Sequence, residues 1–354
     1  ITRLYHTVEK GLSYLNYRPG FGKENVLALV KSMEQYSRQY GVDKFFYQTA
    51  LSVLNEYAKN YTSLYSIAAR CGVFAKSDYF NIFTFEEWKE FFVIEKESVA
   101  EGEVQVHYIN VGQGDCSLIL SEDTAILIDT GEKENGEIIC SYLEKHNVDN
   151  IDCLILTHPH SDHMGAASYV IDNMDVEQII IPKVTDDMIP TTKVYENFLK
   201  SVKNKNLKLT AAKPGMTIDA GEGELEIISP VKDYDNLNNY SAAAVLTHGS
   251  NKFMFTGDIE KKAEKDIIEA GNLTSADVLK VAHHGSNTSS SKEFLDIVDP
   301  DYAVIECGDN SYKHPHEETM ERLSEYTDKI YRTDIDGNIV ITSDKDGLSV
   351  KTEN

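Results

Sequence analysis

The stretch LILTHPHSDHMGA, residues 154–166, constrains the fold of this chain most strongly. An apolar run of strand type is followed at once by His158, His160, Asp162 and His163. A strand that ends at Thr157 would project these side chains from the edge of a sheet, with His158 and His160 on the same side. Imidazole nitrogen and carboxylate oxygen suit Zn²⁺ and other first-row divalent ions. The turn therefore predicts part of a metal site with room for two adjacent ions, against the simpler alternative of a polar loop.

Three other apolar runs end in residues of the same chemical type. KFMFTGDIE leads to Asp258, DVLKVAHHGSNTSSS leads to His283 and His284, and AILIDTG leads to Asp129. Each ending has an ordinary explanation by itself, since an aspartate in a TGD sequence is a common turn residue. Several such strand ends that converge on one sheet edge are the pattern of a functional site.

The chain divides into two regions that differ in the spacing of their apolar residues. Residues 1–98 carry apolar and aromatic residues at three- and four-residue spacing, which predicts a helical N-terminal domain of unknown role. A linker, ESVAEGE at 97–103, is followed by short β-rich runs that alternate with helix-like segments over 103–354. This alternation favours a mixed α/β domain with helices outside paired sheets. The sequence also allows residues 1–98 to bind a protein partner.

Charge is concentrated in the second region and limits the partners. Residues 1–100 hold 12 Lys and Arg against 11 Asp and Glu, whereas residues 101–354 hold 22 against 47, within a net charge of -24. Such a surface repels phosphate backbones, which disfavours broad binding of duplex nucleic acid. The five cysteines form no CxxC pair, and no apolar run reaches the length of a membrane span. The chain starts at Ile1, so both a cytoplasmic and a secreted location with a leader removed stay open.

These motifs resemble the metallo-β-lactamase superfamily. HPHSDH is preceded by LIDTG and followed by TGD and HHGS. The resemblance is closer still to the nuclease-like domain of the ComEC DNA-uptake proteins, through INVGQGDCSLIL, NNYSAAAVLTHGSNKFMFTGDIE, LKVAHHGSNTSS and YKHPHEETMERL, over roughly residues 104–350. It implies an αββα four-layer sandwich with metals at one edge of the sheets. It also implies a metal-bound hydroxide as the nucleophile.

The resemblance assigns the metal ligands residue by residue. It places His158 and His160 on one ion, places Asp162, His163 and one histidine of the 283–284 pair on the other, and lets Asp258 bridge them. We favour His284 as that ligand.

Other residues are assigned supporting roles around the ligands. His283 is then a phosphate contact, and Asp129 and Asp115 are expected to orient the ligands or line the pocket. His314 and His316 resemble the late substrate-contacting histidines of this branch, although histidines in a solvated loop beside a proline are the alternative.

One departure from the wider superfamily concerns the first ion. Most two-metal members carry another histidine before the strand that leads to the bridging aspartate, but the segment here reads DYDNLNNYSAAAVL. Asn239 or Ser241 is expected to assist instead, and His248 is expected at the far end of its strand. Because oxygen ligands suit manganese, the predicted cofactor is one or two divalent ions of zinc or manganese, held more firmly on the Asp162–His163 side.

The predicted function is metal-dependent hydrolysis of a phosphodiester, with DNA as the substrate by resemblance. The acidic surface favours a single strand over a duplex. Asp162, His283, His314 and His316 are the predicted catalytic residues, with His283 or His314 on the anionic transition state and His316 as proton donor to the leaving group. The alternatives are a hydrolase of small phosphoesters, such as phosphocholine esters or cyclic nucleotides, and a non-catalytic binding module stabilised by metal. The missing histidine disfavours β-lactam hydrolysis.

Overall fold

The computed structural model describes residues 98–354. The predicted helical domain and its prospective partner fall almost wholly on residues 1–97, which lie outside the described residues. The predicted domain boundary near residues 98–103 therefore stays a prediction.

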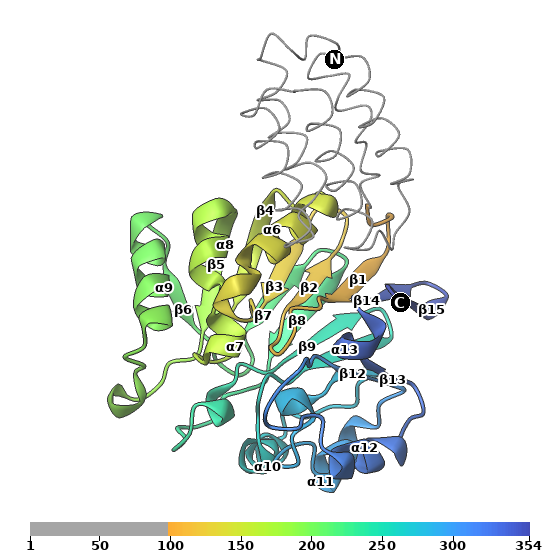
Figure 1. Ribbon diagram of the computed structural model, residues 1–354. Helices are drawn as coiled ribbons and strands as arrows, with labels where there is room; N and C mark the ends of the chain where they lie inside the picture. Colours follow the sequence, from red (N-terminus) through yellow and green to blue (C-terminus); the bar gives the residue numbers. More distant parts are fainter. Residues whose placement is uncertain (1–97) are drawn as a thin grey trace, which may run out of the picture. The chain divides into compact units, whose positions relative to one another are not determined.

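Two mixed sheets form the centre of the described part (Figure 1). The eight-stranded sheet has the order β15-β14-β1-β2-β3-β4-β5-β6. Its strands are β1 Val104–Tyr108, β2 Ser117–Leu120, β3 Ala125–Ile128, β4 Asn150–Ile155, β5 Asp175–Ile181, β6 Leu209–Ala211, β14 Ile339–Asp344 and β15 Gly347–Thr352. The seven-stranded sheet has the order β13-β12-β11-β10-β9-β8-β7. Its strands are β7 Thr217–Ala220, β8 Gly223–Ile227, β9 Ala244–His248, β10 Asn251–Phe255, β11 Val278–Lys280, β12 Tyr302–Ile305 and β13 Ile330–Arg332.

Each sheet combines antiparallel hairpins with one run of four parallel strands. The parallel runs are β3-β4-β5-β6 and β10-β11-β12-β13. Parallel neighbours need a crossover connection, and helices supply it in both sheets. The crossover helices are α6 Gly136–Lys145, α8 Ala167–Asn173 and α9 Lys193–Asn204 in the first sheet, and α10 Lys261–Ala270, α11 Lys292–Val298 and α12 Glu317–Ser324 in the second. Two short helices, α7 Ser161–Met164 and α13 Thr333–Asp336, complete the α-helices of residues 98–354.

Three apolar layers hold these elements together. The innermost layer packs β1 residues such as Val106 against residues of the other sheet such as Leu225 and Phe253. The outer layers join α6, α8 and α9 to the first sheet and α10, α11 and α12 to the second. Strands buried on both faces read as continuous apolar runs, which explains CLIL at 153–156 and AILI at 125–128. The predicted αββα four-layer sandwich is confirmed.

Local sequence signals set the ends of several helices. The hydroxyl groups of Thr192 and Ser291 accept hydrogen bonds from backbone N–H groups in the first turns of α9 and α11. Gly271 ends α10 in a left-handed conformation with φ of 74°. Within residues 98–354, no helix combines the length and the apolar character that a bilayer crossing requires.

Candidate metal centre

The predicted ligands gather where parallel strands of both sheets end. Asp129 follows β3, His158 follows β4 and Asp258 follows β10. The 283–284 histidine pair follows β11. Because neighbouring parallel strands end at the same edge of a sheet, the topology brings these residues together, as ligand sites in α/β folds require.

The first cluster is built by the turn that opens α7. His158 Nε2 lies 2.9 Å from His160 Nδ1, so the two rings direct ring nitrogens at each other. His158 Nδ1 lies 3.2 Å from Thr157 Oγ1 and 3.3 Å from Ser241 Oγ. Ser241 Oγ donates to the Asn238 carbonyl, which leaves its lone pairs free to accept from His158 Nδ1–H. His158 Nε2 is therefore the nitrogen with a free lone pair.

A second cluster lies beside the first, with Asp258 between them. His284 Nε2 and His163 Nε2 lie 3.3 Å and 4.0 Å from Asp162 Oδ2. Asp258 Oδ1 lies 3.3 Å from His163 Nε2 and 3.8 Å from His284 Nε2. Asp258 Oδ2 lies 3.8 Å from His158 Nε2. The carboxylate of Asp258 thus has one oxygen on each cluster, as a bridging ligand would.

The orphaned atoms at this edge fit a divalent cation. His163 Nε2, His284 Nε2 and Asp258 Oδ1 are buried and have no hydrogen-bond partner within residues 98–354. A buried polar atom without a partner costs roughly 1–3 kcal/mol, so several in one place call for an explanation. Groups of three ligand atoms that could hold an ion include His158, His163 and Asp258, and also Asp162, His163 and His284.

Asp129 fixes the orientation of the turn that carries the histidines. Its carboxylate accepts hydrogen bonds from the backbone N–H of Thr157 at 2.7 Å and from the Thr157 hydroxyl at 2.6 Å. It also accepts from His163 Nδ1 at 2.8 Å. The bond to Nδ1 sets the tautomer of His163 and leaves Nε2 free to coordinate.

The GQGD segment packs directly on the same turn. The backbone N–H of Asp115 donates to the Asp162 carbonyl at 3.1 Å. A Cβ atom on Gly114, which has a φ of 142°, would overlap that carbonyl. Glycine is therefore required at residue 114 for the close approach that places Asp115 at the site.

A buried ion pair lies next to the second cluster. Lys280, which is 2 % exposed, donates to Asp115 Oδ2. Asp115 Oδ1 lies 3.2 Å from His284 Nδ1, and His284 Nδ1 donates to the Glu306 carbonyl at 2.9 Å. The Glu306 side chain accepts from the Cys116 N–H and the Ser117 hydroxyl. The hydrogen bond from Nδ1 to the Glu306 carbonyl, with the Asp115 carboxylate beside it, leaves His284 Nε2 facing the metal cluster.

The carboxylates govern the protonation of the ligands. Burial alone would lower the pKa of His163, but Asp258, Asp115 and Asp129 outweigh it and raise that pKa well above its usual value. At His284, burial again lowers the pKa, but Asp258 and Asp115 outweigh it and raise the pKa to about 10. The raised pKa values favour the positively charged form of both imidazoles, and a bound metal ion would supply that positive charge instead.

Two residues expected to assist the first ion have other contacts. Ser241 Oγ supports His158 and accepts from the Asp258 N–H at 3.0 Å. Asn239 Oδ1 accepts from the Glu260 N–H at 3.0 Å, so its amide braces the turn after Asp258. His248 ends β9 at the hairpin and contacts Ser343 Oγ, as expected for the far end of the strand.

Three further histidines, His283, His314 and His316, lie close to the clusters. His283 and His284 both have left-handed backbone conformations, with φ of 53° and 52°. His284 belongs to the groups that could hold an ion, and His283 Nε2 also lies near them, 3.7 Å from Asp258 Oδ2. The His314 ring lies 5.4 Å from that of His283 and 4.8 Å from that of His316.

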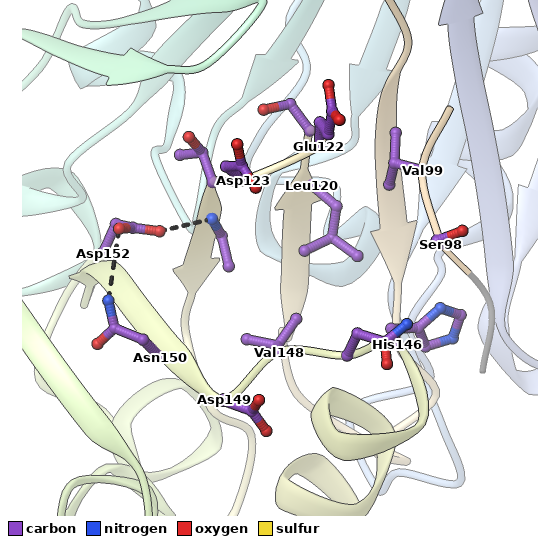
Figure 2. A pocket seen from close by; sticks show the side chains of 14 residues that line it. Ser98, Val99, Leu120, Glu122, Asp123, His146, Val148, Asp149, Asn150 and Asp152 are labelled. Atoms are coloured by element: carbon purple, nitrogen blue, oxygen red, sulfur yellow. Dashed lines mark hydrogen bonds between the residues drawn. The ribbon is translucent and has the colours of Figure 1, made fainter. Parts of the chain in front are cut away.

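A separate pocket of about 270 Å³ lies at the opposite ends of the strands. Figure 2 shows its lining, which comes from the turn between β2 and β3 and from the loop before β4. Asp152 already accepts hydrogen bonds there from Ala125 N–H and Asn150. None of the proposed metal ligands lines this pocket, so it is separate from the metal centre.

Comparison with known families agrees with this geometry. The sequence pattern described as "Metallo-beta-lactamase superfamily" matches residues 109–308. The chain belongs to the metallo-β-lactamase superfamily. Members bind divalent metals, often one or two ions, and the match supports a metal-dependent hydrolase.

Three relatives of this superfamily member are ComEC-type competence proteins. ComE operon protein 3 of Bacillus subtilis is 30% identical over 68% of this chain and 33% of its own length. Recombination protein 2 of Haemophilus influenzae is 32% identical over 70% and 30%. Competence protein ComA of Neisseria gonorrhoeae is 30% identical over 72% and 34%. The predicted resemblance to ComEC-type proteins is confirmed, and the chain spans about a third of the length of these relatives.

Solved structures of the metallo-β-lactamase fold are more distant in sequence. YhfI from Bacillus subtilis is 14% identical, with a TM-score of 0.43 over 64% of this chain and 95% of its own. Igni18, a metallo hydrolase from Ignicoccus hospitalis, is 15% identical, with a TM-score of 0.46 over 67% and 98%.

Sequence reasoning missed several residues that the structure places at this superfamily site. Lys280 reads as part of the strand VLK, and Glu306 follows β12 without a recognisable motif. Asn238 Nδ2 lies 3.4 Å from His283 Nε2. The one available signal was the charge of Lys280 inside an apolar run, because a buried lysine requires a carboxylate partner.

The Lys280–Asp115 pair gives a direct test of this support. Lys280→Met would leave the Asp115 carboxylate buried without its cation, so we expect the free energy of unfolding to fall by about 3–5 kcal/mol. The affinity for Zn²⁺ or Mn²⁺ should fall about 10–100-fold, because Asp115, which lies against His284 Nδ1, loses the cation that holds it in place. Chemical denaturation and competition with a chelating dye measure the two effects.

The double variant Lys280→Met, Asp115→Asn is the matched control. It removes both charges, so we expect much of the stability to return while the metal affinity stays low. Wild-type metal affinity in both variants would show that the pair does not support the centre.

Proposed function

We propose that this protein is a metal-dependent phosphodiesterase that cleaves single-stranded DNA. The observation that carries the proposal is a set of three buried ligand atoms without a hydrogen-bond partner in residues 98–354, where strand ends of the two sheets meet: His163 Nε2, His284 Nε2 and Asp258 Oδ1. The competence proteins among its relatives favour DNA as the substrate. The acidic balance of residues 101–354 favours a single strand bound locally over a duplex bound across the surface.

The proposed ligands form two unequal sets. His158 and His160 would hold one ion, and Asp162, His163 and His284 would hold another, with Asp258 shared. The second set has three protein ligands besides Asp258, whereas the first has two histidines, so we expect the second to bind more tightly. A zinc or manganese ion bound there supplies a Lewis acid, which activates water and neutralises charge on phosphoryl oxygens.

His314 and His283 are the side chains that we propose hold the anionic phosphate. Burial, with the neighbouring His283 and His284, lowers the pKa of His314 to about 4. His314 is therefore neutral near pH 7 and would act as an N–H donor. Its Nδ1 is buried without a partner in residues 98–354, which leaves a polar atom for a ligand. The His283 side chain is 20% exposed and lies beside Asp258, so it is accessible to a phosphoryl oxygen.

His316 is the proposed proton donor to the leaving group. Its Nδ1 accepts a hydrogen bond from the Asn287 backbone N–H at 3.0 Å. A neutral imidazole is too weak an acid for this step, so His316 would act as the protonated ring, and Nε2 is the atom that would give the proton. The leaving alkoxide of a nucleotide needs such a proton, because it is a poor leaving group.

The test of the function is a substrate panel with Zn²⁺ or Mn²⁺. We expect the wild type to cleave a single-stranded oligonucleotide and bis-p-nitrophenyl phosphate, and to cleave duplex DNA more slowly. Asp258→Asn should lower kcat/KM by more than about 100-fold. Loss of a residue that only supports a metal ligand already costs up to about 100-fold, and Asp258 is proposed as a ligand itself. Asp172→Asn, an exposed change on α8, is the control and should keep full activity.

Other outcomes separate the competing functions. Cleavage of the small ester with none of any nucleic acid would contradict the nuclease and favour a hydrolase of small phosphoesters. Biological activity that persists in a folded, metal-free Asp258→Asn variant would indicate a binding module instead.

The proton-donor role predicts a dependence on the leaving group. His316→Gln should lower kcat for the oligonucleotide by about 10²- to 10⁴-fold, because the departing alkoxide loses its acid. Hydrolysis of bis-p-nitrophenyl phosphate should change far less, since p-nitrophenolate leaves without a proton. His248→Gln, at the distant hairpin, is the matched histidine control. Equal losses on both substrates would contradict proton donation by His316.

A further inference from the structure

Tyr312 is a large aromatic side chain left in water next to the proposed active site. It is 70% exposed, the largest exposed fraction among the exposed large hydrophobic residues of 98–354. Single exposed apolar residues are common on protein surfaces, so exposure alone carries no function. What distinguishes Tyr312 is the way its loop is held and the place of its ring.

The loop that carries Tyr312 is fastened at both ends. Asn310 Nδ2 donates to the carbonyls of Gly308 and His314, each at 2.8 Å, and Asn310 Oδ1 accepts from the His314 N–H at 3.0 Å. The Gly308 N–H donates to Gln113 Oε1 at 3.2 Å. A Cβ atom on Gly308 would overlap the backbone of residues 112 and 113. These contacts hold the loop on both sides of the tyrosine.

The Tyr312 ring contacts a histidine that lies close to the metal cluster. The rings of Tyr312 and His314 are stacked, with centroids 5.7 Å apart and an angle of 27° between their planes. The His314 ring lies 6.4 Å from that of His284, one of the proposed metal ligands. Tyr312 therefore stacks on His314, which would contact the phosphate, and His314 separates it from the proposed metal ligand His284.

We propose that Tyr312 is a stacking platform for a nucleobase next to the cleaved phosphodiester. The inference rests on the proposed function and names its substrate class: a nucleic acid whose bases are unpaired and free to stack. Aromatic side chains bind single strands in this way with little dependence on base identity, because every base has a π face. A duplex keeps its bases stacked inside and offers no such face.

Stacking also accounts for nucleic-acid binding by an acidic domain. Residues 101–354 hold 22 basic against 47 acidic side chains, so long-range attraction to a phosphate backbone is weak. A base–aromatic contact does not depend on net charge. Lys313, which is exposed beside Tyr312, adds one local cation for an adjacent phosphate.

The test compares two oligomers of equal length, oligothymidylate and an abasic phosphodiester chain without bases. With Tyr312→Ala, we expect KM for oligothymidylate to rise about 5- to 150-fold, the range of one lost base–aromatic contact, with kcat nearly unchanged. The rise for the abasic chain should be much smaller. Tyr312→Phe should restore the wild-type KM, because the ring and not the hydroxyl group stacks. Leu199→Ala, an exposed apolar change on α9, is the control.

Binding measured without cleavage separates this inference from the proposed function. Fluorescence anisotropy of labelled oligothymidylate, on Asp258→Asn with and without Tyr312→Ala, should show the same loss of affinity. Cleavage of both oligomers with equal KM in wild type and Tyr312→Ala would overturn the stacking role and leave the phosphodiesterase intact. Base-dependent binding by a wild type that cleaves no nucleic acid would support stacking and overturn the nuclease. Equal affinity of both Asp258→Asn proteins for oligothymidylate would overturn the stacking role in either case.

Discussion

The site depends on the attraction between buried carboxylates and the imidazoles that they surround. Asp258, Asp115 and Asp129 face His163, and two of them also face His284. Burying so many carboxylates is unfavourable unless positive charge lies among them. Lys280 neutralises one from behind. The protons on the imidazoles neutralise others, and a divalent ion can take over that role with a stronger field. The same electrostatic need thus shapes both the protein without metal and the proposed holoenzyme.

The fold meets this need by repeating one arrangement in both sheets. Each sheet has four parallel strands joined by three helices, and each sends its strand ends to the site. The first sheet supplies the turn with His158 and His163, and the second supplies Asp258 and His284. Between the sheets, apolar residues such as Phe253 fix the distance across which the ligands meet. Removal of any one strand end would leave the charges of the others unbalanced.

The sequence was sufficient for the site wherever chemistry and local pattern coincide. Apolar runs that end in His158, Asp258 or His284 carry both the strand and the ligand, so the edge and the four-layer fold could be predicted. Contacts between distant residues could not: Lys280 and Asp115 are 165 residues apart, and nothing local marks them as partners. The role of Ser241 behind His158 depends on which face its side chain takes after the 3₁₀ turn at Asn238–Tyr240. The exposure of Tyr312 follows from a loop closed by Asn310, which no periodicity reveals.

Metal binding by the buried cluster can be seen in an anomalous difference map from crystals of protein loaded with Zn²⁺ or Mn²⁺. We expect a strong peak among Asp162, His163 and His284, and a weaker or absent second peak beside His158 and His160. A single ion held by His158 and His160 alone, or no ion at this edge, would contradict it.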